Sequence, residues 1–261
     1  MVTKTPPHAA TRSSRQQAIH LRKSAFACLL ALGVCYVLFV WTTGGRVLDE
    51  WIGLSTSDVA VQPNRSGFAQ AVLAWSGDPL VLAGLLVVVA LVGAVSGRLG
   101  PGLLGIAIVG GSVVGARLLK LILIRPDLGI EASTTHNSFP SGHVAAAAGL
   151  VLAALYAMPT RARWWCAIPG AVAVSTVGAA TVAVGWHRPS DVLGGVLTAT
   201  ALCLLTAACS HAWACRSLPG EHCDTQRYVS DPVDRGRPGR PRRSRTGAEQ
   251  TGTRRARGRV R

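Results

Sequence analysis

Six stretches of this chain are apolar and almost free of charge over about the length that a helix needs to cross a lipid bilayer. Such a helix takes ~20 residues at ~1.5 Å of rise per residue. The six runs lie at 25–43, 79–96, 101–124, 144–158, 164–186 and 192–214. Any single run could be a buried helix of a soluble protein. Together they predict an all-α fold, a polytopic membrane protein with six transmembrane helices.

Basic and acidic residues are distributed unevenly between the connections of these runs. Every charged residue before the first run is basic, and the connections at Arg98 and at Arg161 and Arg163 are basic too. Six spans place both chain ends and these connections on one side, which the positive-inside rule assigns to the cytoplasm. We therefore expect a cell-membrane protein with both termini cytoplasmic. The opposite, outer connections carry Asp49, Glu50, Asp58, Asp78, Asp127, Glu131 and Asp191.

The two ends of the chain differ from the six-helix domain at 25–214. Residues 1–24 are polar and basic, which predicts a disordered cytoplasmic leader. A signal peptide over 1–45 is the alternative, but its apolar run is too long and no clear cleavage site follows. Residues 215–261 are rich in Arg, Gly and Pro and predict a disordered cytoplasmic tail that contacts the anionic inner leaflet. No nucleic acid partner is expected, since no aromatic residues or folded module accompany the arginines.

The longest outer connection is 44–78. Around 67–75 its sequence is amphipathic. This pattern fits a short helix on the outer membrane surface and a plain loop equally well.

The third apolar run carries two cations near its outer end, Arg117 and Lys120, and Arg125 follows it. Charges at membrane depth are costly and usually face a polar interior or a partner. The alternative is that both side chains reach out to the interface. Because Arg117 and Lys120 share one helix face, we favour a functional site.

A polar stretch at 137–143 leads into the fourth apolar run. Its residues Pro140 to His143 form a turn that opens a helix. This places the Ser141 side chain and unpaired backbone N–H groups at the positive end of the helix dipole, where a phosphate is stabilised.

A second polar stretch, at 185–191, separates the last two runs. His187 and Asp191 lie one helical turn apart if this segment is helical. The carboxylate can then hold one imidazole nitrogen and leave the other free to act as a nucleophile. Either His143 or His187 alone could be an interfacial hydrogen-bonding residue. Two histidines with polar neighbours on one side favour a phosphate site.

Taken together, these features resemble the type 2 phosphatidic acid phosphatase superfamily, whose membrane members share a six-helix core. The resemblance covers about residues 100–200 by motif order and spacing. It implies hydrolysis of a phosphate ester or diphosphate through a phosphohistidine intermediate, without a metal or another cofactor.

The resemblance also implies roles for individual residues. His187 would be the nucleophile and Asp191 its orienting carboxylate. His143 would protonate the leaving oxygen and later activate water. Phosphate oxygens would be bound by Ser141, Gly142, Lys120, Arg125, Arg117 and Arg188.

Two positions depart from the family pattern. The family has a Lys seven residues before its Arg-Pro, whereas Lys120 is five residues before Arg125. Either Arg125 acts from a shifted place, or Arg117 takes part, or one cation is lost. The family also has an Arg six residues before the nucleophilic His, where this chain has Thr181. Arg188 is a candidate replacement, although it leaves the helix in a different direction.

We therefore expect an integral membrane lipid phosphatase that acts at the outer membrane face. Its substrate would be a lipid phosphate or diphosphate, of the polyprenyl diphosphate or phosphatidate type. A non-hydrolysing phosphate-binding relative and a lipid phosphotransferase are the alternatives. A transporter is disfavoured because the polar residues cluster at one face instead of at mid-membrane. The sequence does not indicate the lipid or the oligomeric state.

Overall fold

The computed structural model describes residues 7–58, 63–128 and 137–216, and the regular structure within these ranges is entirely helical. This confirms the predicted all-α fold. The helices are α1 (Pro7–Trp41), α2 (Thr43–Asp58), α3 (Pro63–Gly77), α4 (Pro79–Val95), α5 (Leu99–Ile122), α6 (Gly142–Ala157), the 3-10 helix η1 (Thr160–Ala162), α7 (Arg163–Ala183) and α8 (Pro189–Arg216).

Each of the six predicted spans corresponds to a helix, but not all of these helices have the length of a span. Of the described helices, α1, α5, α7 and α8 are long and apolar enough to cross a membrane. The pair α3 and α4 adds a fifth candidate, bent by 61° at the break. Helix α6 has only 16 residues. It ends where Met158 precedes Pro159, because a residue before proline disfavours the helical conformation.

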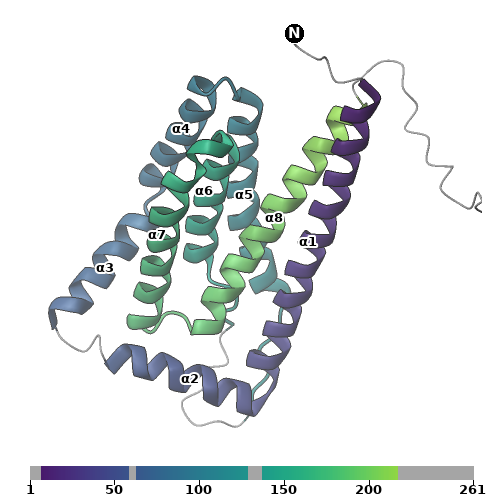
Figure 1. The fold of residues 1–261 in the computed structure, drawn as a ribbon. Helices are drawn as coiled ribbons and strands as arrows, with labels where there is room; N and C mark the ends of the chain where they lie inside the picture. The colour runs from purple at the N-terminus through teal and green to yellow at the C-terminus, as the bar shows by residue number, and fades with distance from the viewer. Residues whose placement is uncertain (1–6, 59–62, 129–136, 217–261) are drawn as a thin grey trace, which may run out of the picture. The chain divides into compact units, whose positions relative to one another are not determined.

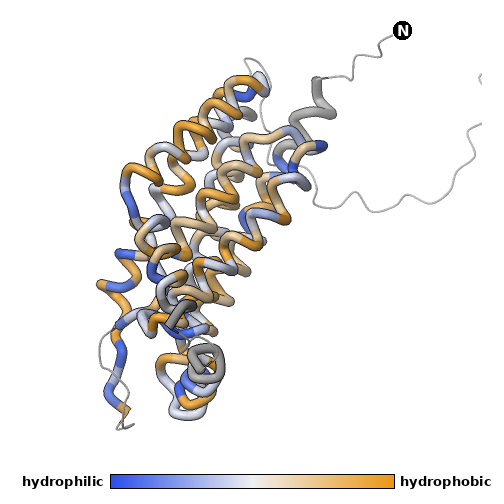
Figure 2. The backbone as a smooth tube through the Cα atoms, turned by 90° about the vertical axis from the view of Figure 1, so that its left-hand side faces the viewer, coloured by the Kyte–Doolittle hydropathy of each residue, from blue (hydrophilic) through white to orange (hydrophobic). Residues whose placement is uncertain are grey.

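The helices pack side by side as a bundle in which α6 contacts α5, α7 and α8, while α1 runs along α8 (Figure 1). Small residues allow close approach, as at Gly149, where a Cβ would lie 2.9 Å from Ser112 Oγ. Apolar positions continue along the helices (Figure 2), and Phe26, Val95 and Trp165 are exposed on the outside, as a lipid-facing surface requires. One core cluster joins α4, α5 and α6 through Val89, Ile108, Val109, Ala153 and Ala157.

Helix α1 begins well before its apolar part. Residues 7–24, which the composition predicted to be disordered, continue the helix, so that prediction is wrong for them. The segment is rich in good helix formers such as Ala, Gln and Arg. It also packs against another helix, since α1 runs along α8 and Ala18 is buried. The predicted disorder of residues 1–6 and of the tail from 217 lies outside the described residues.

The connection at 44–78 contains two helices in place of one loop. Helix α3 includes 67–75, which confirms the helical alternative there. It packs on α7 through Ala69, Leu73 and Ala180. Helix α2 crosses the end of the bundle at which α8 begins (Figure 1). It therefore lies beside the segment that carries His187 and Asp191.

Candidate active site

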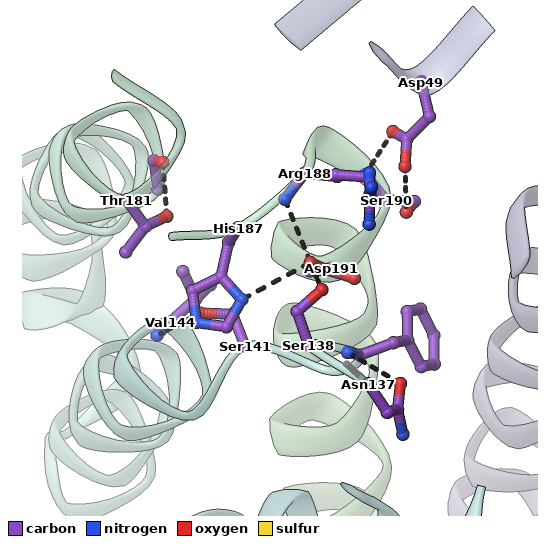
Figure 3. Close-up of polar contacts among 12 residues, drawn as sticks. Asp49, Asn137, Ser138, Ser141, Val144, Thr181, His187, Arg188, Ser190 and Asp191 are labelled. Atoms are coloured by element: carbon purple, nitrogen blue, oxygen red, sulfur yellow. Dashed lines mark hydrogen bonds and ion pairs between the residues drawn. The ribbon is translucent and has the colours of Figure 1, made fainter. Parts of the chain in front are cut away.

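The two polar stretches singled out in the sequence meet at one end of the bundle (Figure 3). The backbone N–H of Ser141 donates to the carbonyl oxygen of Asp191 at 2.9 Å. Glycines on α8 make this approach sterically possible. A Cβ at Gly195 would lie 2.7 Å from the Ser141 oxygen, and one at Gly194 would lie 2.6 Å from the Phe139 ring.

A tight turn after α7 positions His187. Gly185 has a φ of 76°, the left-handed conformation that glycine adopts at helix C-termini. The carbonyl oxygen of Thr181 accepts the backbone N–H groups of Trp186 at 3.0 Å and His187 at 3.2 Å. Thr181 itself is fully buried, and its hydroxyl donates to the Gly178 carbonyl. The position where the family pattern has an Arg is therefore part of the packed turn.

Asp191 is a fully buried carboxylate behind His187. Its Oδ2 lies 3.4 Å from His187 Nδ1 and accepts hydrogen bonds from Ser138 Oγ at 2.6 Å and from the Arg188 N–H at 2.9 Å (Figure 3). These donors fix the carboxylate, which in turn holds Nδ1 of the imidazole. Nε2 of His187 is therefore the nitrogen left for chemistry.

His187 lines a cavity of about 550 Å³ at this end of the bundle. The residues that line it also include His143, Arg117, Lys120 and Gly142, which is at the start of α6. The structure thus brings together five of the predicted site residues in one space. The break between α3 and α4 closes over His143, since a Cβ at position 77 would lie 3.0 Å from His143 Nε2.

Ser141, Arg125 and Arg188 do not line this cavity. Ser141 is fully buried, and its hydroxyl oxygen accepts the Val144 N–H at 3.5 Å, as an N-cap of α6. The guanidinium of Arg188 forms an ion pair with Glu50 of α2 at 3.0 Å. The structure therefore pairs Arg188 with an acidic side chain of another helix and does not bring it into the cavity.

Arg125 follows α5 and is a buried cation that is only partly satisfied. It is 6% exposed, and its Nη1 lies 3.5 Å from Ser138 Oγ. Nε and Nη2 are buried without a hydrogen-bond partner among the described residues. Burial lowers the pKa of Arg125 to about 10, and the nearby positive charge of Arg188 acts in the same direction. An anion at this place would offset both effects.

Helix α2 holds the loops that carry the site. Asp49, which is 1% exposed, accepts the Ser190 N–H at 2.9 Å and the Ser190 hydroxyl. Burial raises the pKa of Asp49, although the hydrogen bonds from Ser190 oppose this shift. Arg46 donates to the Val40 carbonyl at 2.9 Å and to the Pro126 carbonyl. Both site loops are therefore tied to one helix.

The sequence analysis assigned no function to α2, although a signal was present. Arg46, Asp49 and Glu50 are spaced i, i+3 and i+4, which places them on one helix face. Val47 and Trp51 are exposed to the outside, whereas Arg46 and Asp49 are buried. Ser138 was also missed, because nothing in the local sequence indicates that it donates to Asp191.

Comparisons with a family model and with solved structures find similarities to this chain. Residues 79–215 match the family model described as the PAP2 superfamily. The crystal structure of the first transmembrane PAP2 type phosphatidylglycerolphosphate phosphatase from Bacillus subtilis is similar, with a TM-score of 0.57 and 22% identity over 73% of this chain and 96% of that chain. At this identity the likeness shows the fold alone. A comparison with curated proteins finds no match. Helices α1, α2 and α3 lie outside the matched residues.

Within the described ranges, no three His, Cys, Asp or Glu side chains come together as they would around a metal ion.

Proposed function

Because this chain belongs to the PAP2 superfamily, we propose that it is a membrane phosphatase that removes phosphate from a lipid phosphate or diphosphate. One observation carries the proposal. His187, held at Nδ1 by Asp191, shares a cavity with His143, Arg117 and Lys120. A nucleophile, an acid and two cations around one space are what transfer of a phosphoryl group requires. Polyprenyl diphosphates and phosphatidate-type lipids are the proposed substrate classes.

In the first step, Nε2 of His187 attacks the phosphorus and the bond to the leaving oxygen breaks. His143 donates a proton to that oxygen, so the lipid leaves as a neutral alcohol or as a protonated phosphate. Asp191 stabilises the positive charge that develops on the imidazole of His187. In the second step, water attacks the phosphohistidine and gives its proton to His143. The N–P bond breaks, and inorganic phosphate is released.

The cavity also offers groups that offset the charge on the phosphoryl oxygens. Arg117 and Lys120 come from one face of α5, and the N–H of Gly142 lies at the N-terminus of α6. Arg125 adds a buried charge close by, next to Ser138. Removal of one such stabilising group typically lowers the rate by ~10²–10³.

The proposed topology has six crossings, with α3 and α4 as one bent element and α6 as a short one. Sixteen residues of α6 span ~24 Å, less than the ~30 Å hydrocarbon core. His143, at the start of α6, then lies slightly below the membrane surface, where a lipid headgroup can reach it. The basic connections at Arg98 and at Arg161 and Arg163 belong to the end of the bundle opposite the histidine cavity. By the positive-inside rule that end is cytoplasmic, which supports an extracytoplasmic position for the cavity.

The test is release of inorganic phosphate by the full-length protein, purified in detergent, from phosphatidate, phosphatidylglycerolphosphate and a polyprenyl diphosphate. Release is expected with and without a chelator, and His187→Ala should lower it by at least ~10³-fold. Arg161→Gln, an exposed cation far from the cavity, serves as the control and should retain the wild-type rate.

Three results would contradict hydrolysis by His187. Vanadate binding without phosphate release from any of these lipids would indicate a non-hydrolysing relative. A product that forms only when a second alcohol is present would indicate a phosphotransferase. Wild-type activity in His187→Ala would remove the proposed nucleophile altogether.

A further inference from the structure

A second cavity, of about 770 Å³, lies at the opposite end of the bundle. Two helices connect the cavities. On α5, Lys120 lines the histidine cavity and Pro101 lines the second cavity. On α8, His211 lines the second cavity, and His187, just before the start of the helix, lines the histidine cavity. Roughly twenty residues of helix separate the two ends, about 30 Å, which is the thickness of the hydrocarbon core. The second cavity is thus placed at the other membrane surface.

Two arginines converge in this second cavity. Arg98 Nη1 donates to the Met158 carbonyl oxygen at 2.6 Å, and Arg163 Nε donates to the same oxygen at 3.4 Å. No residue that lines the cavity is Asp or Glu. Two guanidinium groups held this close repel each other unless an anion lies between them. The planar donor fork of each Arg matches the oxygens of a phosphate.

The remaining walls combine hydrogen-bonding and apolar groups. His20 and Leu21 come from α1, the segment that was predicted to be disordered, and His211 comes from α8. Tyr156 and Ser210 form a hydroxyl pair at 2.7 Å on the same wall. A water molecule occupies only ~30 Å³, and a phosphate group is only a few times larger. A single phosphate would therefore leave most of the 770 Å³ empty. The cavity suits a headgroup that continues into an apolar part.

We propose that this cavity binds the phosphate group of an anionic phospholipid from the leaflet opposite the active site. Basic pockets between transmembrane helices on the cytoplasmic side bind such headgroups. Arg98 and Arg163 contact the phosphate oxygens, His20 and His211 donate from the flanking helices, and Leu21 contacts the first part of an acyl chain. The site binds without turnover, since no carboxylate among its lining residues could orient an imidazole as Asp191 orients His187.

The experiment measures thermal unfolding of the full-length protein in detergent micelles that contain increasing fractions of phosphatidylglycerol. Phosphatidylcholine micelles and soluble glycerol phosphate are run in parallel. The double variant Arg98→Gln/Arg163→Gln is compared with Arg161→Gln, an exposed cation of η1 that does not line the cavity. Binding to the Arg-rich tail or to the histidine cavity is common to all three proteins.

Phosphatidylglycerol should raise the unfolding midpoint of the wild type and of Arg161→Gln at the same lipid fraction. In the double variant the half-saturating fraction should rise by roughly ten- to thirty-fold, given the contribution of each basic residue near a membrane surface. If the double variant does not fold, Arg163→Gln alone should show about a five-fold weakening.

The two phosphate sources are separated by the parallel samples. An effect of glycerol phosphate that is lost in the double variant supports the phosphate site with a soluble ligand, and an effect of phosphatidylglycerol alone supports the lipid. Equal shifts with phosphatidylcholine and phosphatidylglycerol, or an unchanged titration in the double variant, would overturn the proposal.

Discussion

Arg125 combines deep burial with incomplete hydrogen bonding, and the cost of this arrangement can be worked out. The side chain is 6% exposed, and two of its nitrogens have no partner among the described residues. Its pKa is lowered from 12.5 to about 10, chiefly by burial. At ~1.4 kcal/mol for each tenfold change in proton affinity, the charge destabilises the folded protein by roughly 3 kcal/mol. Because the pKa of this base falls on folding, the penalty is fully present at every pH below about 10 and so at neutral pH.

Replacement of Arg125 by Met tests whether this charge is kept for an anionic ligand. Met has a similar length, packs adaptably and carries no charge. The unliganded Arg125→Met protein should therefore be more stable than the wild type, by up to roughly 3 kcal/mol, or several degrees in unfolding midpoint. Its phosphatase rate should fall by ~10²–10³, the typical loss for a transition-state charge partner.

The assay is thermal unfolding of both proteins in detergent with and without vanadate, together with phosphate release. Vanadate should stabilise the wild type, since the anion compensates the Arg125 charge, and should stabilise Arg125→Met much less. Arg161→Met, a change at an exposed cation, is the control and should leave both midpoints nearly unchanged. A variant that is less stable than the wild type without vanadate would refute the reasoning. So would equal stabilisation of Arg125→Met and wild type by vanadate.

Three further substitutions probe the groups that support the site. Asp49→Asn removes the hydrogen bond that the Asp49 carboxylate accepts from the Ser190 hydroxyl, which is worth ~1.5–3 kcal/mol. In steady-state assays it should lower kcat about ten-fold or more with little change in KM. Ser138→Ala removes the 2.6 Å bond to Asp191 and should lower kcat about ten-fold while vanadate affinity is largely kept. Gly195→Ala would put a Cβ 2.7 Å from a backbone oxygen, whereas Gly110 has open space around it. Gly195→Ala should therefore destabilise the protein in thermal unfolding by ~1–3 kcal/mol and Gly110→Ala should not.

The helices could be predicted from the sequence because hydropathy is a local property. Each apolar run became a helix, and α6 ended at Ala157, next to the Met158 that precedes a proline. The long helical start of α1 could not be predicted in this way. Residues 7–24 lack apolar periodicity, and their order accompanies packing of small residues such as Ala18 along α8. Because α8 is almost two hundred residues away in the sequence, its packing against α1 cannot be predicted from the local composition of residues 7–24.

The candidate site likewise has features that could be predicted from local spacing and features that depend on contacts between distant segments. His187 and Asp191 could be paired from their four-residue spacing, although His187 lies before α8, which begins at Pro189, so their contact crosses the start of the helix instead of following one helical turn. The direction of Arg188 could not be predicted, because it depends on Glu50, which lies on α2. The role of Ser138 likewise depends on a contact with Asp191 across the bundle. Spacing indicates which residues share a helix face, whereas contacts between distant segments decide where that face points.

The partners of the arginines separate the cations that hold the fold from those that the proposed reaction can use. Arg188 is paired with Glu50, and Arg46 donates to backbone carbonyls, so both serve to tie α2 to the loops. Arg117 and Lys120 line the histidine cavity, and Arg125 keeps two buried nitrogens without a partner among the described residues. Because Thr181 is buried and Arg188 points to α2, the proposed phosphate binding depends on the three cations of α5 and the segment that follows it. Loss of any one of these three should therefore reduce phosphate affinity more than loss of Arg188, whose removal should act through the position of the His187 loop.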